Sequence, residues 1–172
     1  MENQTIQNTN PAPKVTYAGF WWRFLAFIID DIILGVVNFI LLVPLWASMG
    51  FSVFSMSQWY DRHPVDDEAA LAMIAPLFGV IILTSLLSIV IQWLYFAVME
   101  SSKHQGTLGK LALGIKVTDM NGDRISFGRA TGRYFGKIIS GMIIYIGYIM
   151  AGLTEKKQAL HDMMASCLVI KT

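Results

Sequence analysis

The sequence predicts an α-helical membrane protein. It should contain two full transmembrane helices, a short third segment that is re-entrant or transmembrane, and a small cytoplasmic β-hairpin or three-stranded sheet. Three observations predict this fold class. Hydrophobic residues make up 55% of the 172 residues. Charged residues make up 15%, whereas soluble domains carry about 25%. Two apolar stretches each exceed the roughly 20 residues that a helix needs to cross a bilayer.

The N-terminal stretch "MENQTIQNTNPAPKVT" is polar and contains two prolines. It lacks the basic start and apolar core of a signal peptide, so we expect a flexible tail. The predicted organisation is therefore a disordered tail over residues 1–16 and one membrane domain over residues 17–172.

Two long apolar segments are the predicted spans. The first runs from about Phe20 to Met49, and the second from about Leu71 to Met99. Trp21 and Trp22 at one end of the first segment, and Trp46 at the other, fit the aromatic belts of the two membrane interfaces. The acidic stretch between the two segments is expected to be a loop outside the membrane.

The stretch "IKVTDMNGDRISF" places "NG" between two β-prone runs, which is a strong signal for a hairpin. It predicts that Ile115–Asp119 pairs with Arg124–Phe127, with a positive φ at Gly122. Two strands alone are marginally stable. We therefore expect Leu168–Lys171 to join them as a third strand.

A helix is expected over "FGRATGRYFGKIIS", and it carries two ridges with a spacing of four residues. Small residues form one ridge, which predicts close helix packing: Gly128, Gly132, Gly136 and Ser140. Basic residues form the other ridge, which predicts contact with lipid phosphates: Arg129, Arg133 and Lys137. An ion pair between the basic ridge and a buried aspartate is the alternative.

The third apolar segment, Ile138–Leu153, is short and interrupted by glycines. Of the 13 Lys and Arg residues, only Arg62 follows the first span before the second begins. Because cytoplasmic segments are enriched in basic residues, the N-terminus is predicted to be cytoplasmic. A third segment that turns back near Gly147 would keep the basic C-terminus on the same side. Both termini are therefore predicted to be cytoplasmic.

The first span contains the polar residues Arg23, Asp30, Asp31 and Asn38. Arg23 lies near the interface, where its long side chain can reach lipid phosphates. Asp30 is too short to do so, and must be protonated, paired or exposed to water. Two interpretations remain open for it: a carboxylate on a proton or cation pathway, or a structural lock between helices. Its expected partners are Ser88, Gln92 or Arg133.

The sequence has no phosphate-binding loop, nucleophile elbow or metal-ligand spacing. We therefore expect no enzyme activity, no cofactor and no metal site. The expected partners are the lipid bilayer and further copies or other membrane subunits, and no nucleic acid.

Three stretches resemble the RDD family of bacterial membrane proteins: "YAGFWWRFLAFIID", "GTLGKLALGIKVTDMNGDRISFGRATGRYFGK" and "KKQALHDMMA". The resemblance covers about Tyr17 to Ile170. It places the family's arginine at Arg23 and its two aspartates at Asp30 and Asp162. The adjacent Asp31 departs from the pattern, because the family commonly has a small residue there.

The resemblance implies a multi-pass protein of the bacterial plasma (inner) membrane. It also implies a role in transport, since the family is associated with transport of unknown ligands and some members with sodium–proton antiport. The first hypothesis is thus a small transporter or transport-related subunit that exchanges cations or protons through Asp30 in an oligomer. The alternative is a non-transport scaffold or assembly subunit. It would bind partners through its cytoplasmic sheet and lipid through its basic ridge.

Overall fold

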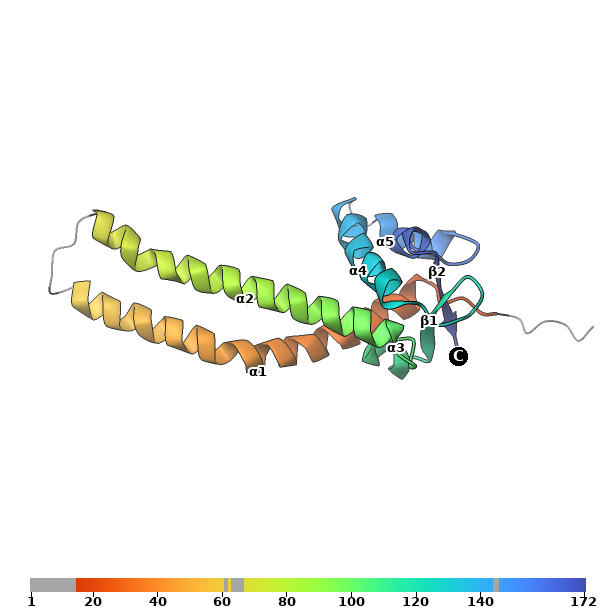
Figure 1. Cartoon of the computed structure of the whole chain (residues 1–172), viewed down its shortest axis with the longest axis horizontal. Coiled ribbons are helices and arrows are strands. Elements are labelled where there is room, and N and C mark those ends of the chain that lie inside the picture. The colour runs from red at the N-terminus through yellow and green to blue at the C-terminus, as the bar shows by residue number, and fades with distance from the viewer. Residues whose placement is uncertain (1–14, 61, 63–66, 144–145) are drawn as a thin grey trace, which may run out of the picture.

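The structure is a computed structural model that describes residues 15–60, 62, 67–143 and 146–172. The elements are α1 (Phe20–Tyr60), α2 (Asp67–Ser101), α3 (Leu108–Ala112), β1 (Ile115–Asp119), α4 (Phe127–Met142), α5 (Ile146–Leu153), α6 (Leu160–Met164) and β2 (Cys167–Lys171). Figure 1 shows α1 and α2 as a long hairpin, with the shorter elements gathered at one end. We call residues 15–30, 95–143 and 146–172 the end unit. The predicted fold class is confirmed, while most of the predicted tail (1–14) lies outside the described residues.

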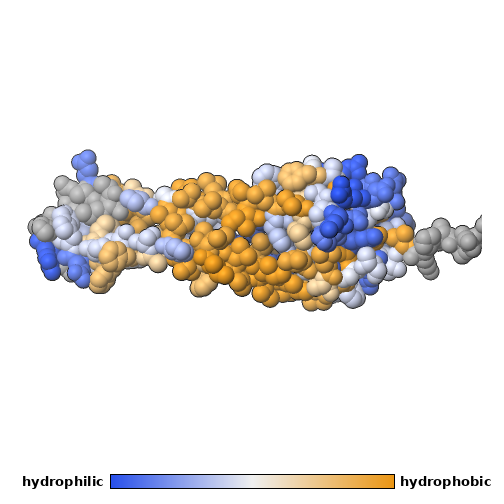
Figure 2. All heavy atoms as spheres, turned by 60° about the horizontal axis from the view of Figure 1, so that its bottom comes forward, coloured by the Kyte–Doolittle hydropathy of each residue, from blue (hydrophilic) through white to orange (hydrophobic). Residues whose placement is uncertain are grey.

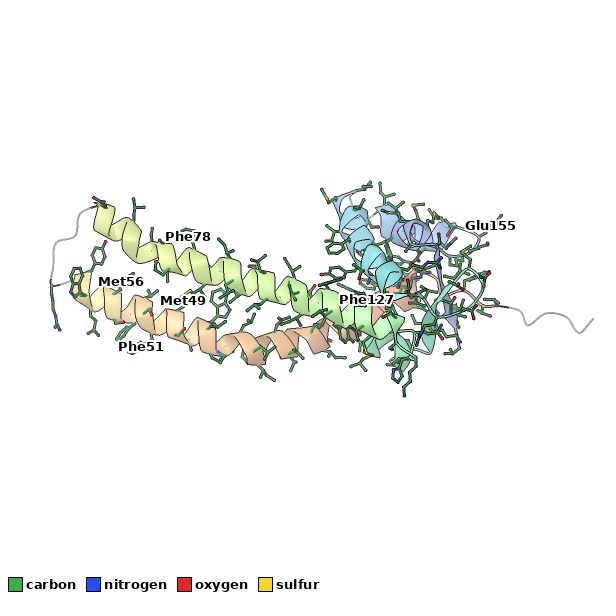
Figure 3. The ribbon with its side chains drawn as sticks, in the orientation of Figure 1. Met49, Phe51, Met56, Phe78, Phe127 and Glu155 are labelled. Carbon is green, nitrogen blue, oxygen red and sulfur yellow. The ribbon has the colours of Figure 1, made fainter. Side chains whose placement is uncertain are left out.

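Helices α1 and α2 are long and apolar enough to cross a membrane. Only 17% of the most apolar window of α1 is buried, and 6% of that of α2. Phe51 and Phe78, which are 72% and 61% exposed, lie on the outer sides of the hairpin (Figure 3). Figure 2 shows the resulting band of apolar side chains between hydrophilic ends. Lipid or other membrane protein must cover this band, because water would not.

The third apolar segment is bent. Helices α4 and α5 meet at 104°, and α4 ends at Met142, before the turn that we expected near Gly147. Gly147 lies instead within α5 and against α4, where an added Cβ would lie 2.8 Å from the Cβ of Ser140. After this close approach α5 folds back, so the chain returns towards the sheet instead of continuing along the direction of α4 (Figure 1).

The sheet has two antiparallel strands, β1 and β2, in a register that pairs Ile115 with Lys171 and Asp119 with Cys167. The predicted hairpin between Ile115–Asp119 and Arg124–Phe127 is therefore wrong. The "NG" turn does form, with Gly122 at φ +93° as predicted. After this turn, however, the Ser126 hydroxyl caps α4 by accepting a hydrogen bond from the backbone N–H of Arg129. The capped helix begins where the strand was expected.

The C-terminal strand β2 pairs with β1, where Arg124–Phe127 was expected to pair. The start of the described chain lies along the other edge of β2. The backbone N–H of Lys171 donates to the carbonyl of Thr16 at 2.8 Å, and that of Ala18 to the carbonyl of Val169 at 2.8 Å. The C-terminus and the start of α1 are therefore joined at the same end of the molecule.

Small and branched apolar residues form the core of the end unit: Ala18, Ala26, Ala97, Ile115, Val117, Ile125, Ala130, Cys167 and Val169. They come from α1 and the residue Ala18 before it, the last turns of α2, both strands, and α4 with the residue Ile125 before it. This core holds the ends of the two long helices against the sheet. It thereby fixes the positions of the charged side chains described next.

Candidate functional site: a buried ionic network

Arg133 lies at the centre of a network of buried charges. Its side chain is only 2% exposed. The guanidinium Nε donates to Asp162 Oδ1 at 2.7 Å, and Nη1 donates to Glu100 Oε2 at 2.8 Å. Glu100 lies in the last turn of α2, and Asp162 lies in α6. One side chain of α4 therefore joins three helices.

Further cations extend the network on both sides. Arg23 of α1 forms an ion pair with Asp162 and donates to the backbone carbonyls of Ala18 and Lys157. Lys110 of α3 forms an ion pair with Glu100. Lys137 Nζ lies 3.8 Å from the same Glu100 oxygen and 3.8 Å from the centroid of the Phe96 ring. Four cations thus share two carboxylates: Arg23, Lys110, Arg133 and Lys137 around Glu100 and Asp162.

Burial and charge shift the protonation of the groups outside the spans. Burial acts to raise the pKa of Asp162, but Arg133 and Arg23 outweigh it and hold this pKa well below its usual range. The carboxylate therefore stays ionised. Burial lowers the pKa of Lys110, and Glu100 opposes that effect. Burial also lowers the pKa of His161 to about 3, so its imidazole is neutral at pH 7.

Asp30 lies apart from this network and is 1% exposed. Its carboxylate accepts three hydrogen bonds: from the Tyr95 hydroxyl at 2.7 Å, the Thr107 hydroxyl at 2.5 Å and the backbone N–H of Gly109 at 2.8 Å. A Cβ at Gly109 would overlap the backbone of Ala26. The glycine therefore lets α3 approach α1 closely enough to bind the carboxylate.

Asp30 thus faces protein, as predicted, but with other partners than the three expected. Ser88 donates to the carbonyl of Thr84 instead, and Arg133 binds Asp162. Arg23 is also placed differently from the prediction. Its side chain is 12% exposed and paired, so it does not extend to lipid phosphates.

The basic ridge proves to be divided. Arg129 is exposed, with its guanidinium 3.9 Å from Asp119. Lys137 is half-buried beside Glu100. Arg133 is buried, so the predicted contact of Arg133 with lipid phosphate is wrong. The alternative, an ion pair with a buried aspartate, is right, and the aspartate is Asp162.

The glycine ridge is divided in the same way. Gly136 packs against α6, where an added Cβ would lie 3.1 Å from the Cβ of His161. Gly128 and Gly132 are exposed, and an added Cβ at either would meet no atom within 4 Å. Within this chain they are therefore not packing positions, contrary to the prediction.

Two polar residues of the first span have no partner among the described residues. Asp31 is exposed and makes no hydrogen bond or ion pair with the described part of the chain. Asn38 is half-buried, and its buried side-chain oxygen has no hydrogen-bond donor within that part. The structure therefore separates Asp30, which is fully bonded, from its neighbour Asp31.

Glu100 and Lys110 were not predicted from the sequence to be members of the site. The sequence could have indicated them, because each is a charged residue in or beside an apolar stretch, where burying a charge is costly unless it is paired. The roles of Tyr95 and Thr107 had no such signal. Across the described residues, no three His, Cys, Asp or Glu side chains gather where they could hold a metal ion.

Comparison of the sequence with known proteins identifies a family and two relatives. The sequence profile of the RDD family matches residues 17–166, a range that includes Arg23, Asp30 and Asp162. The chain is 42% identical over 153 residues to "Uncharacterized protein YxaI" of Bacillus subtilis, covering 89% of this chain and 96% of that protein. It is 27% identical over 178 residues to "Uncharacterized membrane protein YteJ" of the same organism, covering 99% and 92%. No solved structure matches.

Proposed function

The chain is a membrane protein of the RDD family, and we propose that it acts as a non-transport scaffold or assembly subunit. One observation carries this proposal. Asp30, the carboxylate that the transport hypothesis uses, and Asp162, the second aspartate of the family pattern, are fully buried and bonded within the chain.

A carboxylate that carries protons or cations must reach water and release its partners during each cycle. Asp30 accepts three hydrogen bonds, two from hydroxyls and one from a backbone N–H that cannot turn away. Asp162 is bound by two guanidinium groups and by the backbone N–H of Ala159 at 3.1 Å. Breaking either set would leave several buried polar groups without partners. The arrangement therefore suits a static lock better than a moving site.

The proposed scaffold does not use the edges of its sheet. Thr16–Ala18 cover one edge of β2. The edge of β1 that faces away from β2 is blocked at its centre, because the backbone N–H of Val117 donates to the carbonyl of Gln105 at 2.6 Å. A partner could not easily add a strand there. Partners would instead contact the helices, and Arg129 remains the member of the basic ridge best placed for lipid phosphate.

We place the protein in the bacterial inner membrane with the end unit, and both termini, in the cytoplasm. The basic residues support this orientation, because all but Arg62 lie in the N-terminal region or after the second span.

Flux and stability measured on the same variants test the proposed function. Purified wild type and Asp30→Asn are reconstituted in liposomes, and pH-driven cation flux is compared with that of protein-free liposomes. We expect no flux from either protein and a lower melting temperature for Asp30→Asn. Wild-type flux above that of protein-free liposomes would overturn the scaffold, and its loss in Asp30→Asn with the melting temperature unchanged would assign the flux to Asp30.

Cation–proton exchange in an oligomer is the second candidate, and Asp31 is the observation that favours it. Unlike Asp30, this carboxyl group is exposed on the span and has no partner among the described residues. If exchange occurs, Asp31→Asn should abolish flux without lowering the melting temperature.

A further inference from the structure

The face of α1 that carries Asp31 and Asn38 leaves polar groups without a partner among the described residues: Asp31 is exposed, and Asn38 is half-buried. Both residues lie in the apolar band, and the neighbouring Ile28 and Ile32 are 38% and 62% exposed. The side-chain oxygen of Asn38 is buried and has no donor among the described residues. Lipid tails offer no donor or acceptor, so such groups are expected to face protein.

These residues belong to one stripe along the helix. Asp31, Gly35, Asn38 and Leu42 follow one another at intervals of four, three and four, the spacing of a coiled-coil seam. A groove of about 370 Å³ runs along this stripe and is lined by Gly35, Asn38, Phe39, Leu42, Val43 and Trp46. Gly35 is exposed, and an added Cβ there would meet nothing within 4 Å. A second helix could therefore approach the backbone closely.

We propose that α1 of a second copy of this chain packs into this groove, so that the two stripes meet about a two-fold axis along the membrane normal. Copies inserted in the same orientation bring identical residues together at such an axis. An asparagine amide both donates and accepts, so Asn38 pairs with its own copy. The two Gly35 residues, which are exposed, permit close contact at the same axis.

This dimer rests on the proposed assembly role and names its partner. It also explains why the two long helices bury so little of their surface within one chain. Little of either span is buried within one chain. A seam between two α1 helices covers one more face of α1 and does not involve the end units.

Cysteine cross-linking in native membranes tests the seam. Leu42→Cys lies in the groove and leaves Asn38 intact. Ile40→Cys is the matched control, because Ile40 is 66% exposed at nearly the same depth but lies about 200° away around the helix. The wild type serves as the blank, since its single cysteine, Cys167, is buried. We expect oxidation to produce a dimer of Leu42→Cys at least tenfold more efficiently than of Ile40→Cys.

Adding Asn38→Leu to Leu42→Cys should reduce the dimer severalfold while the melting temperature of the monomer is retained. Equal cross-linking at positions 40 and 42, no dimer at position 42, or a product with a different protein would each overturn the inference. The flux assay distinguishes this failure from that of the scaffold. A missing dimer with no flux rejects the seam alone, whereas a dimer with flux rejects the scaffold alone.

Discussion

Arg133 and Asp162 form a buried ion pair in which Nε of the guanidinium donates to Oδ1 of the carboxylate at 2.7 Å. The same guanidinium also binds Glu100, so residues from α2, α4 and α6 meet at one side chain. A guanidinium can bind two carboxylates because its planar group presents several donors in fixed directions. An ammonium group at this position could not reproduce both bonds.

We predict that Arg133→Leu lowers the free energy of unfolding by about 3–5 kcal/mol, because it removes the central cation and leaves buried carboxylates incompletely paired. Arg133→Lys should fall between this variant and the wild type. Thermal unfolding in detergent measures the effect. Arg129→Leu is the control, and should change the free energy by at most about 1 kcal/mol because its side chain is half exposed. A wild-type melting temperature for Arg133→Leu would show that the network does not stabilise the fold.

The two long helices could be predicted because bilayer thickness and hydropathy determine them with little help from tertiary contacts. The positive φ of Gly122 was predictable for a similar reason, since it depends on the local turn. The partner of β1 was not. Whether β1 pairs with residues 124–127 or with β2 depends on a contact between distant parts of the chain, and the Ser126 cap decides it in favour of β2.

The candidate site was predictable in some of its members, but not in Glu100 or Lys110 and not in most of its pairs. Arg23, Asp30, Arg133 and Asp162 were all selected from the sequence. The prediction that all residues of a ridge share one environment was wrong, because a spacing of four residues advances a helix by about 400°. Each step therefore turns the ridge by about 40° around the helix. Arg129 is therefore exposed while Arg133 is buried, and Gly132 is exposed while Gly136 is buried. Only the packing of α4 shows where along the ridge burial begins.

Two glycines should respond in opposite directions to the same substitution. We predict that Gly109→Ala lowers the free energy of unfolding by about 1–3 kcal/mol, because its Cβ would overlap the backbone of Ala26 and crowd Asp30. Gly132→Ala should instead be neutral or stabilise by up to about 1 kcal/mol, since it adds helix propensity in open space. Thermal unfolding of both variants checks this. Destabilisation by Gly132→Ala would restore the view that the whole ridge is a packing face.

The two ends of the molecule should differ in their access from outside the cell. We predict that Ser57→Cys, exposed near the far end of α1, reacts with a membrane-impermeant thiol reagent in intact cells. Thr172→Cys, which is exposed on the end unit, should react only after the cells are broken. The buried Cys167 of the wild type provides the background. Efficient labelling of Thr172→Cys in intact cells would reverse the proposed orientation.

Acid should destabilise the protein through His161 at pH values where the carboxylates are still ionised. Burial lowers the pKa of His161 from 6.5 to about 3, so the folded protein keeps a neutral imidazole while the unfolded chain takes up a proton. The stability associated with this group is therefore complete above pH 6.5 and falls as the pH drops from 6.5 towards 3, by up to about 1.4 kcal/mol per pH unit. The depressed pKa of Asp162 acts only at lower pH, below the usual carboxyl range near 3.8. We predict that the melting temperature of the wild type decreases between pH 6.5 and 4.5, and that His161→Gln removes most of this decrease even if it lowers the melting temperature at pH 7. An equal decrease in the variant would show that another group takes up the proton.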